Sequence, residues 1–170
     1  LLKFAMPSEI STESIEPKGL IEETLSLVKY RISLINIKIR TEFCKEKILV
    51  DVDKNQMQQV LFNLVMNAVD AMGKGGEITA RITKAASSEA IGGKKACIME
   101  IIDTGEGISQ ENLSKLFEPF FTTKRDKKGT GLGLSISKII VENHKGVLEF
   151  ESQAKQGTTA RIILPVFDPS

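Results

Sequence analysis

The sequence predicts a two-layer α/β sandwich with its helices packed on one face of a sheet. Residues 53–72 carry apolar side chains at steps of three and four, which is typical of a helix with one buried face. Two pairs of strand-like segments each enclose a turn, as hairpins do: 77–83 with 96–103, and 146–152 with 158–165. The 170 residues suffice for one compact core and are too few for two.

The composition excludes several classes of protein. Hydrophobic residues make up 41% and charged residues 26%, and the formal charge of +1 gives no reason to expect a nucleic acid or a membrane surface as partner. The apolar runs are shorter than a bilayer span, and no signal-peptide pattern is present. Cys44 and Cys97 form no CxxC pattern, which argues against a metal site or a disulfide framework. A reducing, cytoplasmic location is expected.

The first sixteen residues are predicted to precede the domain. The apolar 1-LLKFAMP-7 ends at a proline and predicts the last turn of a helix, and residues 8–16 predict a polar connector. Because the chain begins with leucine and not methionine, we expect a fragment of a longer protein.

Helix and strand patterns alternate in the next part of the chain. Near-helical spacing predicts a helix over 19–34, and alternating or continuous apolar residues predict strands over 35–43 and 48–52. The helix over 53–72 should begin at Asp53 as its N-cap and stop at Gly73. Its buried positions are predicted to be Met57, Val60, Leu61, Leu64, Val65, Ala68 and Met72.

The second half predicts two hairpins with a helix between them. The small-residue segment 84–95 should form the loop at the tip of the first hairpin. Residues 109–118 predict a short helix, and 119–130 a long irregular loop. Residues 132–143 predict a helix with Leu132, Ile136, Ile139 and Ile140 on one face. The last two strands flank a turn over 153–157.

Three alternate glycines in 129-GTGLGLS-135 suggest a phosphate-binding loop. A P-loop would require a lysine after Gly133, where this chain has Leu134, and the dinucleotide fingerprint has a different glycine spacing. The segment still supplies N–H groups at the start of a helix, which is a favourable place for an anion.

Three other motifs precede this one in a fixed order: 63-NLVMNAVDAM-72, 103-DTGEGI-108 and 117-FEPFFTTK-124. Together the four resemble the N box, first glycine box, F box and second glycine box of two-component sensor histidine kinases, members of the GHKL superfamily. NAVDAM and EPFFTTK are most similar to the nitrogen-regulation type. The resemblance covers residues 17–165.

The resemblance implies the Bergerat-type ATP-binding fold, whose sheet is mixed and mostly antiparallel. It also implies the organisation of the chain. Residues 17–168 would form the catalytic domain, with a lid over about 119–131 that closes on ATP. Residues 1–16 would be the end of a helical dimerisation and phospho-acceptor domain plus its linker.

Asn63, Asn67 and Asp70 share one polar face of the helix over 53–72. Amide oxygens are hard, neutral ligands that suit Mg²⁺ bound to a triphosphate. The resemblance assigns Asn67 as the Mg²⁺ ligand and Asn63 as its support. A solvated polar face is the alternative. Asp70 stands where many sensor kinases have a phosphate-binding cation, so phosphate neutralisation would fall more on Mg²⁺ and the lid.

Asp103 ends an apolar strand, where its carboxylate can accept a hydrogen bond from the amino group of adenine. Gly105 and Gly107 let the backbone approach the base, and Ile108 offers it an apolar face. A simple D-T-G turn is the alternative. The resemblance implies that Asp103 contacts adenine and that Thr158 supports it through a water.

The basic segment before the glycines resembles a lid over the triphosphate, although a solvated loop would look the same. Phe117, Phe120 and Phe121 would hold its base, with Phe117 in the core, and Lys124 would touch phosphate as a catalytic cation. The remaining residues expected at the nucleotide are Thr123, Gly129, Thr130, Gly131, Leu132, Gly133 and Leu134.

The residue four before Asn67 separates kinase from hydrolase. Hydrolytic GHKL relatives have a glutamate there to activate water, and an amide such as Asn63 cannot act as a base at neutral pH. We therefore expect phosphate transfer to a histidine. His144 ends a helix, where a cationic imidazole would suit the helix C-terminus, and is not expected to be the acceptor. The acceptor should lie upstream of Leu1.

The predicted function is that of a protein histidine kinase catalytic domain that uses ATP and Mg²⁺. The implied partners are the histidine-bearing dimerisation domain of the same protein, expected to be a homodimer at full length, and a response regulator. The alternative is an ATP-regulated protein-binding module without phosphate transfer.

Overall fold

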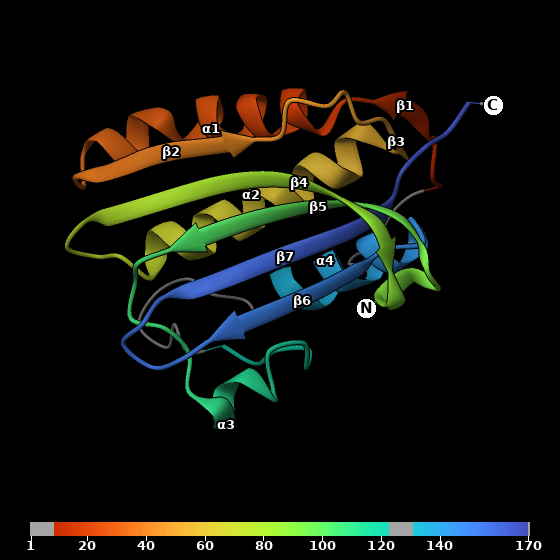
Figure 1. Cartoon of the computed structure of the whole chain (residues 1–170). Coiled ribbons are helices and arrows are strands. Elements are labelled where there is room, and N and C mark those ends of the chain that lie inside the picture. The colour runs from red at the N-terminus through yellow and green to blue at the C-terminus, as the bar shows by residue number, and fades with distance from the viewer. Residues whose placement is uncertain (1–8, 123–130, 170) are drawn as a thin grey trace.

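A computed structural model describes residues 9–122 and 131–169 of the chain. Its main feature is a five-stranded sheet in the order β2-β4-β5-β7-β6 (Figure 1). The strands are β2 (Ile37–Phe43), β4 (Gly76–Ser88), β5 (Lys94–Asp103), β7 (Thr158–Pro165) and β6 (Val147–Ser152). The β2–β4 pair is parallel and the other three pairs of this sheet are antiparallel.

Three helices cover one face of the sheet: α1 (Pro17–Ser33), α2 (Lys54–Asp70) and α4 (Gly133–Asn143). A single helical turn, α3 (Gln110–Leu113), follows β5. The predicted sandwich, with a mixed and mostly antiparallel sheet and helices on one face, is confirmed. In the described part of the chain, no helix is long and apolar enough to cross a membrane.

The core lies between α2 and the inner face of the sheet. All seven apolar positions predicted for α2 are buried, and none is more than 3% exposed. They pack in one cluster with Ile78, Met99 and Ile162 from the central strands. Burying each side chain of this size contributes roughly 1.5–3 kcal/mol, so the 3.6-residue period of α2 fixes which of its faces is left for chemistry.

The ends of α2 are set by local hydrogen bonds. The Asp53 carboxylate accepts from the Gln56 N–H at 3.0 Å, as an N-cap does, and from the Ser11 N–H at 3.0 Å. These backbone N–H groups lower the pKa of Asp53. The helix ends at Asp70, earlier than the predicted stop at Gly73.

Two predicted irregular segments contain strands. Part of the predicted connector forms β1 (Glu13–Ile15), which pairs antiparallel with β3 (Val50–Val52) in a separate two-stranded sheet. The predicted loop 84–95 is mostly hairpin, because β4 continues to Ser88 and β5 starts at Lys94. Ladder hydrogen bonds come from the backbone, so small side chains do not prevent pairing.

The buried face of α4 agrees with the predicted one only in part, since Ile140 is buried and Ile136 packs against the core. Ser137, Ile140 and Val141 are the buried residues of this helix, whereas Ile136 and Ile139 are only half-buried. The apolar pattern did not reveal this face because one of its members is a serine whose hydroxyl is satisfied by a neighbouring helix.

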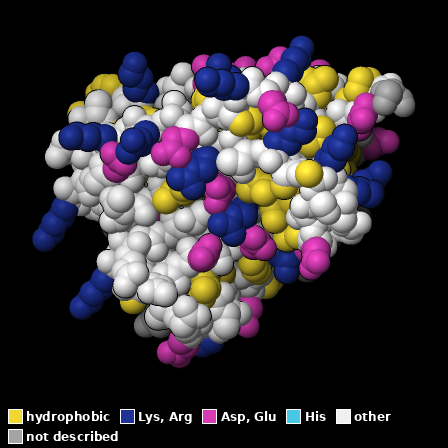
Figure 2. All heavy atoms as spheres, in the orientation of Figure 1, with side chains coloured by type: hydrophobic (Ala, Val, Ile, Leu, Met, Phe, Trp, Pro, Cys, Tyr) yellow, Lys and Arg dark blue, Asp and Glu magenta, His cyan; other side chains and the backbone are white. Residues whose placement is uncertain are grey.

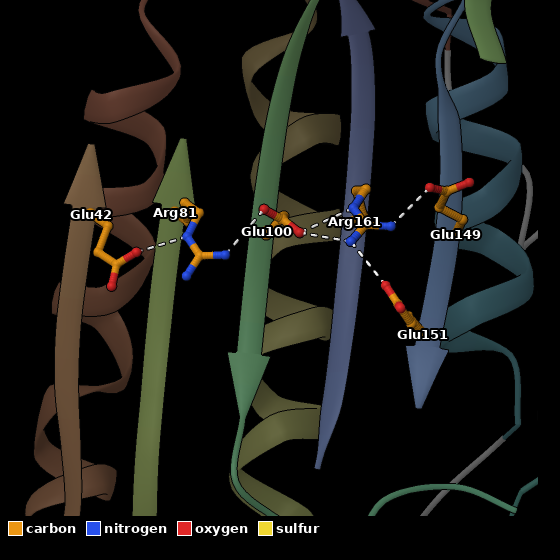
Figure 3. Close-up of polar contacts among 6 residues, drawn as sticks. All are labelled: Glu42, Arg81, Glu100, Glu149, Glu151 and Arg161. Atoms are coloured by element: carbon orange, nitrogen blue, oxygen red, sulfur yellow. Dashed lines mark hydrogen bonds and ion pairs between the residues drawn. The ribbon is translucent and has the colours of Figure 1, made fainter. Parts of the chain in front are cut away.

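The other face of the sheet is open and carries a ladder of charges (Figure 2). Arg161 on β7 donates from Nε and Nη2 to Glu100 on β5, at 3.0 and 2.9 Å, and also pairs with Glu149 and Glu151 on β6. Arg81 on β4 continues the ladder to Glu42 on β2, so that charged pairs reach across all five strands (Figure 3). This pairing of charges suits a face that water covers.

Candidate nucleotide-binding site

The N box meets the second glycine box where α2 packs against α4. Asn63 is half-buried and donates from Nδ2 to the Ser137 hydroxyl at 3.2 Å. A Cβ on Gly133 would lie 2.5 Å from Asn63 Oδ1, so only glycine allows α4 to begin this close to α2. The start of α4, where the first N–H groups have no partner within the helix, therefore lies beside the polar face of α2.

Asn67 and Asp70 follow Asn63 on the same side of α2, and both are half-buried. Asn67 is one helical turn from Asn63, which places the two amide groups in a row along the helix. This arrangement offers neutral oxygen ligands of the kind that Mg²⁺ accepts. The assignment of Asn67 as a metal ligand stays a prediction.

The first glycine box packs on the end of α2. Asp103, at the end of β5, is 7% exposed, and its Oδ1 accepts from the Gly105 N–H at 2.8 Å. Burial raises the pKa of Asp103, although the N–H groups of Gly105 and Thr158 act in the opposite direction. A Cβ on Gly105 would lie 2.6 Å from the Ala71 carbonyl oxygen, to which the Glu106 N–H donates at 3.2 Å.

The other side of this loop rests on the turn between β6 and β7. Gly107 has φ +73°, and a Cβ there would lie 1.9 Å from the Gln153 carbonyl oxygen. The Ile108 N–H donates to the Ser152 hydroxyl at 2.8 Å. The loop after Asp103 is thus held between α2 and the 153–157 turn, with glycine at both contacts.

The F box is joined to the second glycine box through the backbone. The Phe120 N–H donates to the Gly131 carbonyl at 3.0 Å. Phe120 is 70% exposed, so it does not anchor the base of the loop as predicted. Phe117 does pack against the core, with its ring edge-on to Phe150 at 5.7 Å between centroids and with Lys138 Nζ 4.9 Å from its centroid.

The described part of the chain thus brings the four motifs to one end of the sheet. The predicted site residues that lie there are Asn63, Asn67, Asp103, Gly105, Gly107, Ile108, Phe120, Gly131, Leu132, Gly133, Leu134 and Thr158. Thr123, Lys124, Gly129 and Thr130 lie outside the described residues, as does the predicted last turn of a helix at 1–7.

Two serines at the site were not predicted. Ser137 pairs with Asn63, and Ser152 joins the loop after Asp103 to β6 and β7. A serine within a helix or at a strand end carries no periodic signal. Only the tertiary structure shows that both are buried, at 2% and 8% exposure.

His144, the one histidine of the chain, is 6% exposed and both of its ring nitrogens have partners. Nε2 accepts from the Asp53 N–H at 3.0 Å, and Nδ1 lies 2.7 Å from the Ile140 carbonyl oxygen. Because an N–H can only donate and a carbonyl can only accept, Nε2 is the acceptor of this ring and Nδ1 is its donor. This histidine caps α4 and ties it to the start of α2.

Comparison with known proteins shows the family of this chain. A family model described as "Histidine kinase-, DNA gyrase B-, and HSP90-like ATPase" matches residues 52–168. Sporulation kinase A of Bacillus subtilis is 39% identical over 166 residues, which cover 97% of this chain and 26% of that protein. The chain thus spans about a quarter of the length of this curated relative.

Solved structures of histidine kinases share the fold. The catalytic domain of histidine kinase ThkA superimposes with a TM-score of 0.78 at 31% identity, covering 91% of this chain and 95% of that domain. ThkA in complex with the response regulator protein TrrA matches with a TM-score of 0.79 at 28% identity, covering 98% of this chain and 45% of that chain.

The match to the ThkA catalytic domain extends over nearly the whole of that domain, and the residues matched by the family model include all four motifs. Similarity to the nitrogen-regulation type within the family stays a prediction. The chain belongs to the histidine kinase-, DNA gyrase B- and HSP90-like ATPases, and within them it is a histidine kinase catalytic domain.

Proposed function

We propose that this domain binds ATP with Mg²⁺ and transfers the γ-phosphate to a histidine on a separate dimerisation domain, for relay to a response regulator. The main support for the proposal is that the four motifs contact one another. Gly133 packs closely against Asn63, Gly105 packs against Ala71, and the Phe120 N–H donates to the Gly131 carbonyl. The complex of ThkA with a response regulator supports the choice of downstream partner.

Each motif has a distinct task in this proposal. The Asp103 carboxylate accepts a hydrogen bond from the adenine amino group, and the N–H groups at the start of α4 face the phosphates. Asn67, supported by Asn63, holds Mg²⁺, which would neutralise phosphate charge when bound. Lys124 would add a cation from the segment outside the described residues.

The acceptor must come from elsewhere because this chain offers no accessible histidine. The imidazole of His144 is buried, and the lone pair of Nε2 already accepts from Asp53. A phosphoryl group needs a free ring nitrogen lone pair. The domain therefore carries the nucleotide site without its own phosphate acceptor.

Asn63 predicts very slow hydrolysis of ATP. Its side chain is an amide that donates to Ser137, so it has no basic group with which to activate water. We expect negligible phosphate release from ATP, and no further decrease in Asn63→Ala, in a steady-state phosphate assay. Robust hydrolysis that depends on Asn63 would contradict the assignment.

Asn67→Ala is expected to remove the Mg²⁺-dependent part of the ATP affinity. Loss of a metal ligand should weaken binding about tenfold or more in Mg²⁺ and leave the affinity in EDTA nearly unchanged. Calorimetric titration of ATP in each buffer measures both values. Asn55→Ala, at an exposed asparagine near the start of the same helix, is the matched control and should bind like the original chain. Unchanged affinity of Asn67→Ala in Mg²⁺ would remove Asn67 from the ligand set.

A further inference from the structure

Three buried polar residues form a row across three adjacent strands beside the site. Asp103 on β5 pairs in register with Thr158 on β7, which pairs with Ser152 on β6. Register partners project to the same face of a sheet, so their side chains are neighbours on the helix-covered face. Their exposures are 7%, 9% and 8%. Ser152 is thus the buried end of a row that leads to Asp103.

The Ser152 hydroxyl has three partners and a single hydrogen. It accepts from the Ile108 N–H at 2.8 Å and donates to the Gly157 carbonyl at 2.9 Å. Its third partner is the Thr158 hydroxyl at 2.8 Å. Because the only hydrogen of Ser152 goes to a carbonyl, the Thr158 hydroxyl has to donate to Ser152. The lone pairs of Thr158 Oγ1 are then left as acceptors.

Thr158 Oγ1 and the carboxylate of Asp103, which are neighbours in this row, are therefore both hydrogen-bond acceptors. A pair of acceptors matches a ligand group that offers two hydrogens, directly or through one water, as an exocyclic amine does. A 6-oxopurine has an acceptor oxygen in place of this amine. It therefore leaves Thr158 Oγ1 and the Asp103 carboxylate unpaired, which weakens its binding.

We propose that Ser152 is a positioning residue that sets the base specificity of the site. By taking the Thr158 proton, it fixes Thr158 as an acceptor beside Asp103 and favours a 6-aminopurine over a 6-oxopurine. The same hydroxyl holds the Ile108 backbone, and so the loop after Asp103, against β6. This inference rests on the proposed binding of ATP.

The two roles of Ser152 have different readouts. Loss of the Ile108 contact weakens every nucleotide alike, whereas a freed Thr158 hydroxyl can donate to a 6-oxo group and so changes the ratio of affinities. We therefore measure dissociation constants of the 170-residue chain for ATP and for inosine triphosphate, which carries a 6-oxo group, by calorimetric titration.

The original chain should prefer ATP by at least about tenfold. Ser152→Ala should lower the ATP affinity about tenfold and the ATP-to-inosine-triphosphate ratio about fivefold or more. Ser152→Cys, which keeps the side-chain shape but donates and accepts weakly, should also lower the ratio and serves if the alanine variant does not fold. Ser152→Ala should leave the ratio unchanged when Thr158→Val has already removed the threonine hydroxyl.

The outcomes separate the inference from the proposed function. If the original chain prefers ATP and both Ser152 variants keep the original ratio, Ser152 has only a structural role and the inference is overturned. If the original chain binds both nucleotides equally, the adenine assignment of the proposed function is itself overturned.

Discussion

Asp103→Ala is expected to weaken ATP binding roughly ten- to a hundredfold, because it removes a charge-assisted hydrogen bond worth about 1.5–3 kcal/mol. Asp103 is buried at the end of β5, and one of its oxygens is already held by the Gly105 N–H. The carboxylate is therefore fixed in place before a ligand arrives. Calorimetric titration with ATP gives the affinity.

The isosteric Asp103→Asn variant should separate the effect of Asp103 on ATP affinity from its effect on the stability of the fold. Burial raises the pKa of Asp103 in the folded state, so the folded chain holds this proton more tightly than the unfolded chain does. Above the raised pKa the ionised carboxylate destabilises the fold. The free energy of unfolding therefore rises as the pH falls through the pKa of Asp103 in the folded chain towards its pKa in the unfolded chain. We thus expect Asp103→Asn to raise the urea midpoint at neutral pH while it weakens ATP binding.

The same carboxylate sets a pH dependence of binding. Since the ionised form accepts the adenine hydrogen bond, the ATP affinity should decline as the pH drops towards the raised pKa of Asp103, at a higher pH than for an ordinary aspartate. Asp103→Asn has no such carboxyl group and serves as the control titration. An Asp103→Ala variant that binds ATP as tightly as the original chain does would contradict the assigned role of Asp103.

Gly107→Ala should disrupt both the fold and the site through a single added methyl group. The φ of +73° at this position is unfavourable for alanine, and the new Cβ would lie 1.9 Å from a backbone carbonyl oxygen that cannot turn aside. The left-handed backbone costs about 1–2 kcal/mol and the overpacking about 1–3 kcal/mol. We expect a loss of stability of roughly 2–5 kcal/mol, together with at least a tenfold loss of ATP affinity.

Gly92→Ala separates these two contributions. Gly92 has nearly the same φ, +72°, at the tip of the β4–β5 hairpin, and its Cβ would meet nothing within 4 Å. It should lose only about 1–2 kcal/mol in urea unfolding and keep its ATP affinity. Equal losses of stability and of binding in the two variants would show that the contact with the 153–157 turn is unimportant.

Elements with a strong hydrophobic period were predictable from the sequence. All seven positions predicted to be buried over residues 53–72 are buried, and the closing hairpin of β6 and β7 lies within a residue of its predicted bounds. Elements stabilised by partners distant in sequence were not. The strand β1 has three residues and exists through its pairing with β3, and the buried face of α4 includes a serine.

The same division holds at the site. The positions of Asp103 at a strand end and of the glycines at close contacts were predictable because the motifs fix their spacing along the chain. Ser152 and Ser137 were not, because each matters through hydrogen bonds to residues that only the fold brings near. The hydrogen bond of His144 likewise joins its Nε2 to the Asp53 N–H, 91 residues away. Sequence spacing predicts which groups can act, and the fold decides how each is hydrogen-bonded and oriented.

In the proposed reaction, this domain phosphorylates a histidine that it does not contain. The direct test mixes the chain with ATP, Mg²⁺ and a separately purified, histidine-bearing dimerisation domain from the same protein, and measures acid-labile phosphate on each. We predict phosphohistidine on the dimerisation domain, none on the catalytic chain, and loss of the signal when the acceptor histidine is replaced or when Asp103→Ala is used. Tight ATP binding with no phosphohistidine under any condition would contradict the kinase assignment and favour an ATP-regulated binding module.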